Sequence, residues 1–202
     1  KRFTKLFHRS FTYLEYGFDY SQVDSIGKQD KKYDAVFLSR LVPFKGVEDL
    51  VCVWEKVVSI LPKAVLLIIG SGSEPYKELI QERIRTKNLV SNIQFAGQIR
   101  GLEKFKLLRQ SRVFLYFSHF ESYAQVIDEA IASDLPIVAY DLEVYHSRSQ
   151  YTDALYLFPI GQYDKAASKI IDILQDPIKH RNKIEKKFPH WKHFAEQETE
   201  FL

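Results

Sequence analysis

Short, unbroken runs of apolar residues alternate along the chain with segments whose apolar residues recur at helical spacing. The runs predict six strands, at Tyr33–Ser39, Ala64–Ile69, Asn92–Ala96, Val113–Phe117, Pro136–Tyr140 and Leu155–Phe158. The segments between and after them predict helices, at 47–61, Glu74–Lys87, Leu102–Gln110, Gln125–Ser133 and Tyr163–Leu174. Because the strands are apolar throughout rather than alternating, each should be buried on both faces, as in a parallel sheet with helices on either side.

Strands and helices that alternate in this way define a fold class. Right-handed crossovers between parallel strands give an α/β, Rossmann-like, doubly wound sheet of about six strands with helices on both faces. We expect this domain to span residues 31–188. Residues 1–30 then form a linker from a preceding N-terminal domain, and residues 189–202 form a terminal helix. Since the chain begins at Lys1 and contains no methionine, we expect a piece of a longer protein.

Composition narrows the function classes without choosing one. Of the 202 residues, 46% are hydrophobic and 27% are charged, which is the balance of an ordinary globular protein. The net charge of +3 is too small for a dedicated nucleic-acid binder, so we expect no nucleic-acid partner. The apolar runs are too short to span a bilayer, and the single cysteine, Cys52, allows no disulfide within the chain. These features suit a cytoplasmic protein.

Two cations follow the first predicted strand. Arg40 and Lys45 flank the short loop that joins this strand to its helix. Cations at the carboxyl end of a strand, beside the N-terminus of a helix, form a site for phosphate groups. The alternative is a pair of solvated loop cations that bind no ligand.

Two glutamates lie where the apolar strand Val113–Phe117 runs into a helix. Glu121 precedes the helix and Glu129 lies about two turns inside it, with seven residues between them. Strand-to-helix junctions of this kind bind ligands in open α/β sheets, and the two carboxylates could hold two parts of one extended ligand. The alternative is that Glu121 complements the helix dipole while Glu129 is solvated.

Glycines end the second and third predicted strands. Gly70-Ser71-Gly72 resembles the start of a dinucleotide fingerprint but lacks its later glycine, so a tight turn is the better interpretation. Gly97 suits either a turn or a close approach of the backbone to a ligand. No histidine is spaced from the cysteine as in a zinc site, so we expect no bound metal.

Taken together, these motifs resemble the C-terminal, donor-binding half of a GT-B glycosyltransferase of the large retaining family 4, also called glycosyl transferases group 1. The similarity covers roughly residues 13–202. It rests above all on Glu121 to Glu129, which match the family's E-x7-E motif, and on Ser39 to Gly46, which are similar to G-R-L-x-x-x-K-G. Further similar segments are Tyr16–Asp19, Ile69–Gly72, Ile93–Gly97, Leu135–Ala139 and the final helix with Trp191.

The resemblance implies transfer of a sugar from a UDP- or GDP-sugar to an acceptor hydroxyl with retention, in glycan, polysaccharide or glycolipid synthesis. As catalytic residues it implies Arg40 and Lys45, which neutralise the leaving diphosphate, and Glu121, which holds the donor sugar. The remaining implied donor-binding residues contact the sugar and distal phosphate, the ribose, or the base: Ser122, Tyr123, Ala124 and Gln125; Glu129; and Gly97 and Ile99.

The resemblance also implies partners and conditions. It implies no cofactor and no metal ion: the sequence has no D-x-D motif, and cations and helix dipoles do what a metal ion does elsewhere. The acceptor glycan or lipid-linked sugar would be bound by the missing N-terminal domain, so this chain alone should transfer little sugar. The basic stretch from Lys179 to Lys192 suits peripheral contact with the cytoplasmic membrane face, or a solvated helix face.

Departures from the family pattern keep other functions open. Ala124 and Asp134 stand where family members usually carry glycine, and Asp141–Arg148 replaces a glycine-rich loop that ends in glutamate. A non-catalytic module that binds a nucleotide sugar or a partner is therefore a second interpretation. A sugar-nucleotide epimerase is a third, with His119 as its nearby acid–base candidate.

Overall fold

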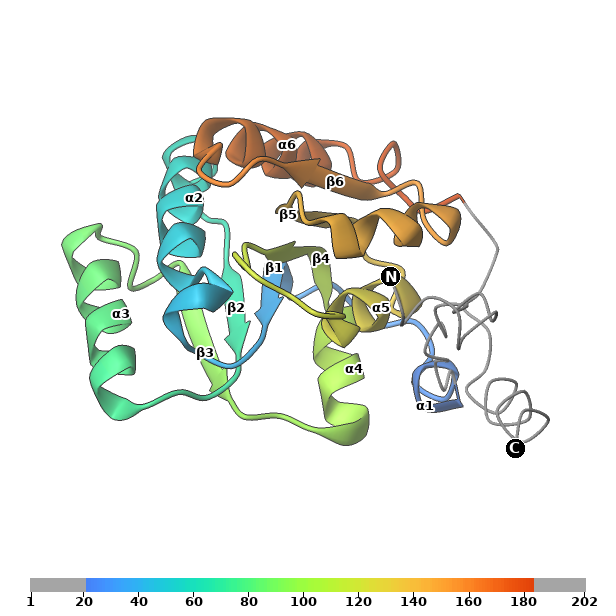
Figure 1. The fold of residues 1–202 in the computed structure, drawn as a ribbon, viewed down its shortest axis with the longest axis horizontal. Coiled ribbons are helices and arrows are strands. Elements are labelled where there is room, and N and C mark those ends of the chain that lie inside the picture. Colours follow the sequence, from blue (N-terminus) through green and yellow to red (C-terminus); the bar gives the residue numbers. More distant parts are fainter. Residues whose placement is uncertain (1–20, 184–202) are drawn as a thin grey trace, which may run out of the picture. The chain divides into compact units, whose positions relative to one another are not determined.

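A computed structural model of the chain describes residues 21–183, and its centre is one parallel sheet (Figure 1). The six strands are β1 (Tyr33–Leu38), β2 (Leu66–Ile69), β3 (Ile93–Gly97), β4 (Ser111–Tyr116), β5 (Ile137–Tyr140) and β6 (Leu155–Phe158). They lie in the order β3-β2-β1-β4-β5-β6, and every pair is parallel. The predicted doubly wound, Rossmann-like sheet is confirmed.

Helices cover the sheet on two sides. They are α1 (Ser21–Asp24), α2 (Val47–Ile60), α3 (Glu74–Thr86), α4 (Gly101–Arg109), α5 (Gln125–Ala132) and α6 (Tyr163–Gln175), with short 3-10 helices η1 (Pro43–Lys45) and η2 (Glu143–Gln150). Helix α2 packs against α3 and α6, whereas α1 packs against α4 (Figure 1). All five helices predicted from apolar spacing are present, with ends that differ by at most one residue.

The core lies on both faces of the sheet, and helix α2 supplies a large part of it. Along α2 the residues Leu50, Trp54 and Val57 recur at helical spacing and are fully buried. The buried indole of Trp54 donates a hydrogen bond to the carbonyl of Asn92 at 3.1 Å, so its polar atom is satisfied as well. This packing fixes α2, and with it the loop that precedes α2, against the sheet.

The chain reverses direction across the sheet between β1 and β4. From β1 it moves outward through β2 to β3, then returns to place β4 on the other side of β1. The loops after β1 and β4 therefore lead to helices on opposite sides, and such a switch point leaves a crevice at the carboxyl ends of the strands. Both loops carry residues that the sequence analysis predicts to bind a ligand.

Backbone contacts hold these two loops together. The N–H of His119, after β4, donates to the carbonyl of Phe44, after β1, at 2.8 Å. Gly46 has φ of 68°, and a Cβ there would overlap the carbonyl oxygen of Phe117. Only glycine allows both this backbone conformation and this close approach. The spacing between Lys45 and the β4 loop thus depends on Gly46.

Some predictions fall outside this region. The segments 1–20 and 184–202, with Tyr16–Asp19, Trp191 and the terminal helix, lie outside the described residues. The domain boundaries at 30 and 188 therefore stay predictions. Within residues 21–183, no helix is long and apolar enough to cross a membrane.

Candidate functional site

A lysine, a tyrosine and a glutamate meet at the carboxyl ends of β1 and β4. The ammonium of Lys45 lies 2.5 Å from Glu121 Oε1 and 3.3 Å from the hydroxyl of Tyr116. That hydroxyl donates to the same Oε1 atom at 2.6 Å. Lys45 comes from η1, Tyr116 from the end of β4 and Glu121 from the loop after it. We call these three residues the switch-point cluster.

The switch-point cluster is largely shielded from water. The side chains of Lys45 and Glu121 are only 11% and 7% exposed. Burial, followed by the hydrogen bond to Glu121, raises the pKa of the Tyr116 phenol, which therefore stays protonated and donates. The ammonium of Lys45 also lies 5.3 Å from the ring centre of Phe44, within range of a cation–π contact. A fixed cation and a fixed carboxylate thus stand side by side in the crevice.

Arg40 differs from Lys45. It lies directly after β1 and is exposed. Among residues 21–183 its side chain has no hydrogen-bond or ion-pair partner. Of the two cations predicted to bind phosphate, the structure fixes Lys45 in place and leaves Arg40 free to turn toward a ligand.

The start of α5 is unusual. Ala124 precedes the helix with φ of 61° and ψ of 60°, a left-handed backbone conformation that residues other than glycine rarely adopt. No side chain caps the helix, and the N–H of Ile127 donates to the Ala124 carbonyl, which leaves the N–H groups of Gln125 and Val126 available to an anion. Ser122 and Gln125 are exposed, Tyr123 is half-buried and Ala124 is buried. The four predicted donor-binding residues of this segment therefore form one turn beside Glu121.

Glu129 is not solvated, so the alternative interpretation of this residue is wrong. Its side chain is 8% exposed, and Oε1 lies 2.7 Å from the ammonium of Lys104 on α4. Burial raises the pKa of the carboxyl, while the hydrogen bond from Lys104 acts in the opposite direction. A partly desolvated carboxylate of this kind is suited to accept hydrogen bonds from a diol.

Gly97 and Ile99 lie apart from the switch-point cluster. Gly97 ends β3, and β2 separates β3 from β1. Gly97 has φ of 71°, which suits a backbone turn, and a Cβ there would meet no protein atom within 4 Å. Within residues 21–183, no side-chain hydrogen bond or ion pair connects these two residues to Lys45 or Glu121. Their proposed contact with the base remains a prediction.

The sequence did not predict two residues that form hydrogen bonds with the predicted site residues. Tyr116 reads as part of an apolar strand, and Lys104 as an ordinary polar position of a helix. The signal for Tyr116 is its place as the last residue of β4, since polar groups at that end reach the crevice. Nothing in the local sequence of Lys104 indicates its pairing with Glu129, 25 residues away.

His119 belongs to a network that holds the β4 loop. Its Nε2 lies 2.7 Å from Asp49 Oδ2, and the hydroxyls of Tyr140 and Tyr163 donate to Asp49 at 2.7 and 2.8 Å. The hydrogen bond to Asp49, with burial second, raises the pKa of Tyr163 to about 12. The network joins α2, β5 and α6 to the loop that carries Glu121. His119 thus positions the loop, which weakens its candidacy as an epimerase acid or base.

Metal ligands do not gather at this site. Across residues 21–183, no group of three or more histidine, cysteine, aspartate or glutamate side chains is placed to hold a metal ion. The polar groups that the structure brings together are those of a site for an anionic, hydroxyl-rich ligand.

The chain belongs to a family of glycosyltransferases. Its sequence matches the family described as Glycosyl transferases group 1 over residues 21–191. This match confirms the resemblance drawn from the motifs, and the sheet is that of one half of a GT-B glycosyltransferase.

Two curated relatives show the range of the family. The chain is 31% identical over 160 residues to poly(glycerol-phosphate) alpha-glucosyltransferase of Bacillus subtilis, covering 78% of this chain and 23% of that protein. It is also 31% identical over 144 residues to phosphatidyl-myo-inositol mannosyltransferase of Mycolicibacterium smegmatis, covering 70% and 36%. The chain therefore spans between 23% and 36% of the length of these two relatives.

Two solved structures superpose on this chain. A variant of S. aureus TarM, solved with Fondaparinux, alpha-GlcNAc-glycerol and UDP, superposes with a TM-score of 0.66 at 26% identity, covering 75% of this chain and 30% of that one. Sucrose-phosphate synthase of Thermosynechococcus elongatus gives a TM-score of 0.76 at 20% identity, covering 92% and 50%. The second similarity is one of fold alone.

Proposed function

We propose that this chain is the donor-binding half of a glycosyltransferase that takes its sugar from a UDP- or GDP-sugar. The observation that carries the proposal is the switch-point cluster, in which Lys45 and Glu121 stand together at the crevice between β1 and β4. A nucleotide diphosphate sugar presents an anion beside a set of hydroxyls, which matches a cation beside a carboxylate.

The proposed binding exchanges one partner of Lys45 for another. The donor diphosphate takes the place of Glu121 at the Lys45 ammonium, with Arg40 turning in from the loop. Glu121, still held by the hydroxyl of Tyr116, then accepts from hydroxyls of the donor sugar. The first N–H groups of α5 bind the distal phosphate, and Glu129 accepts from the ribose.

Stabilisation of the leaving group follows from the same arrangement. Negative charge grows on the diphosphate as the bond to the sugar breaks, and preorganised cations and N–H groups stabilise that charge. We propose that Lys45, Arg40 and the start of α5 do this without a metal ion, and that the sugar is transferred with retention. The acceptor, a glycan or lipid-linked sugar, is bound by the part of the protein beyond this chain.

Calorimetric titration tests the phosphate assignment. The ligands are UDP-glucose, UDP-N-acetylglucosamine, GDP-mannose and UDP, and the variants are Lys45→Met and Arg40→Ala. A charge-assisted hydrogen bond contributes about 1.5–3 kcal/mol, so each variant should weaken donor binding by about tenfold to a hundredfold. Lys77→Ala is the control, because this lysine forms only an exposed ion pair with Glu74; its donor affinity should stay unchanged.

The outcome that contradicts the assignment is donor affinity unaltered in both Lys45→Met and Arg40→Ala. A loss shared equally by the Lys77→Ala control would point to a general charge effect instead of a specific site.

A further inference from the structure

A buried arginine ties η2 to the start of α5. Arg148 and Asp128 are 6% and 3% exposed. Nε of Arg148 lies 3.0 Å from Asp128 Oδ1, and one terminal nitrogen lies 3.4 Å from Oδ2. That same nitrogen donates to the carbonyl of Tyr123 at 2.9 Å. The other terminal nitrogen donates to the carbonyl of Val144 at 2.5 Å and to the hydroxyl of Ser147 at 3.3 Å.

These contacts use all five N–H donors of the guanidinium. Burying an arginine and a carboxylate costs free energy that even a good ion pair often fails to recover, so such a pair is weak evidence of a role in stability. What this pair does is fix the relative positions of three segments: η2, the first turn of α5 through Asp128, and the peptide of Tyr123.

The peptide group of Tyr123 lies next to a strained backbone conformation. Tyr123 directly precedes Ala124, whose left-handed backbone is strained for a residue with a side chain. Such a conformation persists only where the surroundings hold it. Arg148 binds the Tyr123 carbonyl, and its guanidinium carbon lies 4.5 Å from the centre of the Tyr123 ring, so both backbone and side chain are held.

The same 3-10 helix also reaches the switch-point cluster. Tyr145 is fully buried, and its ring centre lies 6.5 Å from that of Tyr116, whose hydroxyl binds Glu121. Helix η2 therefore contacts both the turn before α5 and the tyrosine that orients Glu121. A single rigid element sets the geometry of both.

We propose that Arg148 is a positioning residue, which holds the turn Tyr123–Gln125 in its donor-binding conformation before the donor arrives. This inference rests on the proposed function, because it concerns the same donor site. Held in advance, the N–H groups at the start of α5 lose little freedom when a phosphate binds. Released, the turn relaxes away from the left-handed conformation and the donor must order it again.

The test measures donor affinity and backbone opening in Arg148→Lys and Arg148→Met. Lysine keeps the charge, but its three donors on one nitrogen cannot reproduce the five contacts that the planar guanidinium makes. We expect Arg148→Lys to weaken UDP-glucose, UDP-N-acetylglucosamine or GDP-mannose binding by about tenfold, and Arg148→Met by more. Amide hydrogen exchange should become faster in both variants at Ile127, whose N–H donates to the carbonyl of Ala124 at 2.9 Å.

A stability-matched control separates positioning from general loss of structure. Ile173 is fully buried on α6, which packs mainly against α2 and the strands β4, β5 and β6, so Ile173→Ala should lower stability without a direct effect on the turn. All variants are compared at the same interval below their melting temperatures. Under those conditions Ile173→Ala should bind donors, and exchange the amide hydrogen of Ile127, as the unaltered protein does.

Two results would overturn the inference. In the first, Arg148→Lys binds donors and exchanges the amide hydrogen of Ile127 as the unaltered chain does. In the second, Ile173→Ala shows the same losses as Arg148→Lys. Failure of the proposed function looks different. In that case the unaltered chain binds no nucleotide sugar, and the exchange measurement alone decides whether Arg148 holds the turn.

Discussion

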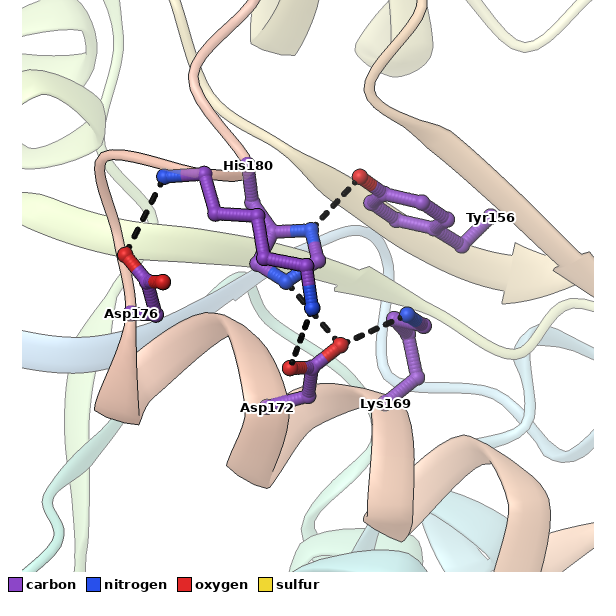
Figure 2. Close-up of polar contacts among 6 residues, drawn as sticks. Tyr156, Lys169, Asp172, Asp176 and His180 are labelled. Atoms are coloured by element: carbon purple, nitrogen blue, oxygen red, sulfur yellow. Dashed lines mark hydrogen bonds and ion pairs between the residues drawn. The ribbon is translucent and has the colours of Figure 1, made fainter.

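Two clusters of charged side chains and tyrosines in this molecule have nearly the same chemistry and different surroundings. The switch-point cluster joins Lys45 and Glu121 to Tyr116. The second, which we call the α6 cluster, joins Lys169, Asp172, Lys179 and His180 to Tyr156 (Figure 2). Both contain a carboxylate with a lysine partner and a tyrosine hydroxyl at hydrogen-bond distance from one member.

Position separates the two clusters. In the α6 cluster, Lys169 and Asp172 are three residues apart on one helix, and Asp172 is 35% exposed. Tyr156 lies on β6, the edge strand, and the buried His180 ties the chain after α6 to it (Figure 2). Two of its residues, Lys169 and Asp172, line a surface depression of about 510 Å³. The depression lies beside β6, which β5 separates from β4, whereas the switch-point cluster lies where the order of the strands reverses. That position favours the switch-point cluster as the candidate ligand site.

Removing the negative charge of the switch-point cluster should have the largest effect. In Glu121→Gln, the acceptor for donor sugar hydroxyls is weakened while Lys45 loses a competitor for phosphate. We expect nucleotide-sugar binding to fall by about tenfold or more, and UDP to bind at least as tightly as before. Calorimetric titration with UDP and UDP-sugars measures the two affinities separately.

Glu74→Gln is the matched control for Glu121→Gln. Glu74 also pairs with a lysine, Lys77, but on the exposed surface of α3. This variant should leave both affinities unchanged. If Glu121→Gln weakened the binding of UDP and of the UDP-sugars by the same factor, Glu121 would serve to position Lys45 and would not bind the sugar.

The sequence predicted the fold well because the relevant signal is local. Each strand is an unbroken apolar run, and each helix has a regular apolar face, so the elements can be read one at a time. The meeting of Lys45 with Glu121, 76 residues later, was predictable in part. Both follow strands, and the carboxyl ends of parallel strands share one edge of the sheet.

The partners of the site could not be read in this way. Tyr116 is hidden in an apolar run, because a buried tyrosine gives the same apolar pattern whether or not its hydroxyl binds a charged partner. The pairing of Arg148 with Asp128 joins η2 to α5 across 20 residues, and neither segment carries a pattern that predicts it. The solvated interpretation of Glu129 was wrong for the same reason, since Lys104 lies on another helix.

The Lys104–Glu129 pair offers a smaller, pH-dependent effect at the same edge of the sheet. Burial raises the pKa of Glu129 above its ordinary 4.5, and Lys104 opposes that shift. If Glu129 accepts from the ribose as a carboxylate, donor affinity should fall as pH decreases through this raised pKa. Lys104→Met removes the opposing cation, so the fall should begin at a higher pH. Binding at neutral pH should weaken by about threefold.

Titration of donor binding from neutral to acid pH measures this shift, with Glu129→Gln as the control. Glutamine does not titrate, so the pH-dependent step assigned to Glu129 should be absent. A step of the same size and position in Glu129→Gln would assign it to another group, and an unshifted step in Lys104→Met would exclude Lys104 as its partner.

The smallest effect on donor binding should come from the α6 cluster. Asp172→Asn removes its carboxylate and should change donor affinity by less than about twofold, because distant sites act independently.

The hydrogen bond from Lys169, then that from His180, holds the pKa of Asp172 well below its usual range. A carboxyl group whose pKa is lower in the folded than in the unfolded state stabilises the fold at pH values above its unfolded-state pKa, near 4. That contribution is lost as pH falls. Urea unfolding should therefore show Asp172→Asn less stable than the unaltered chain at neutral pH, and the difference in stability should close below about pH 4. A donor affinity reduced as much as in Glu121→Gln would make the α6 cluster part of the ligand site and end the contrast between the two clusters.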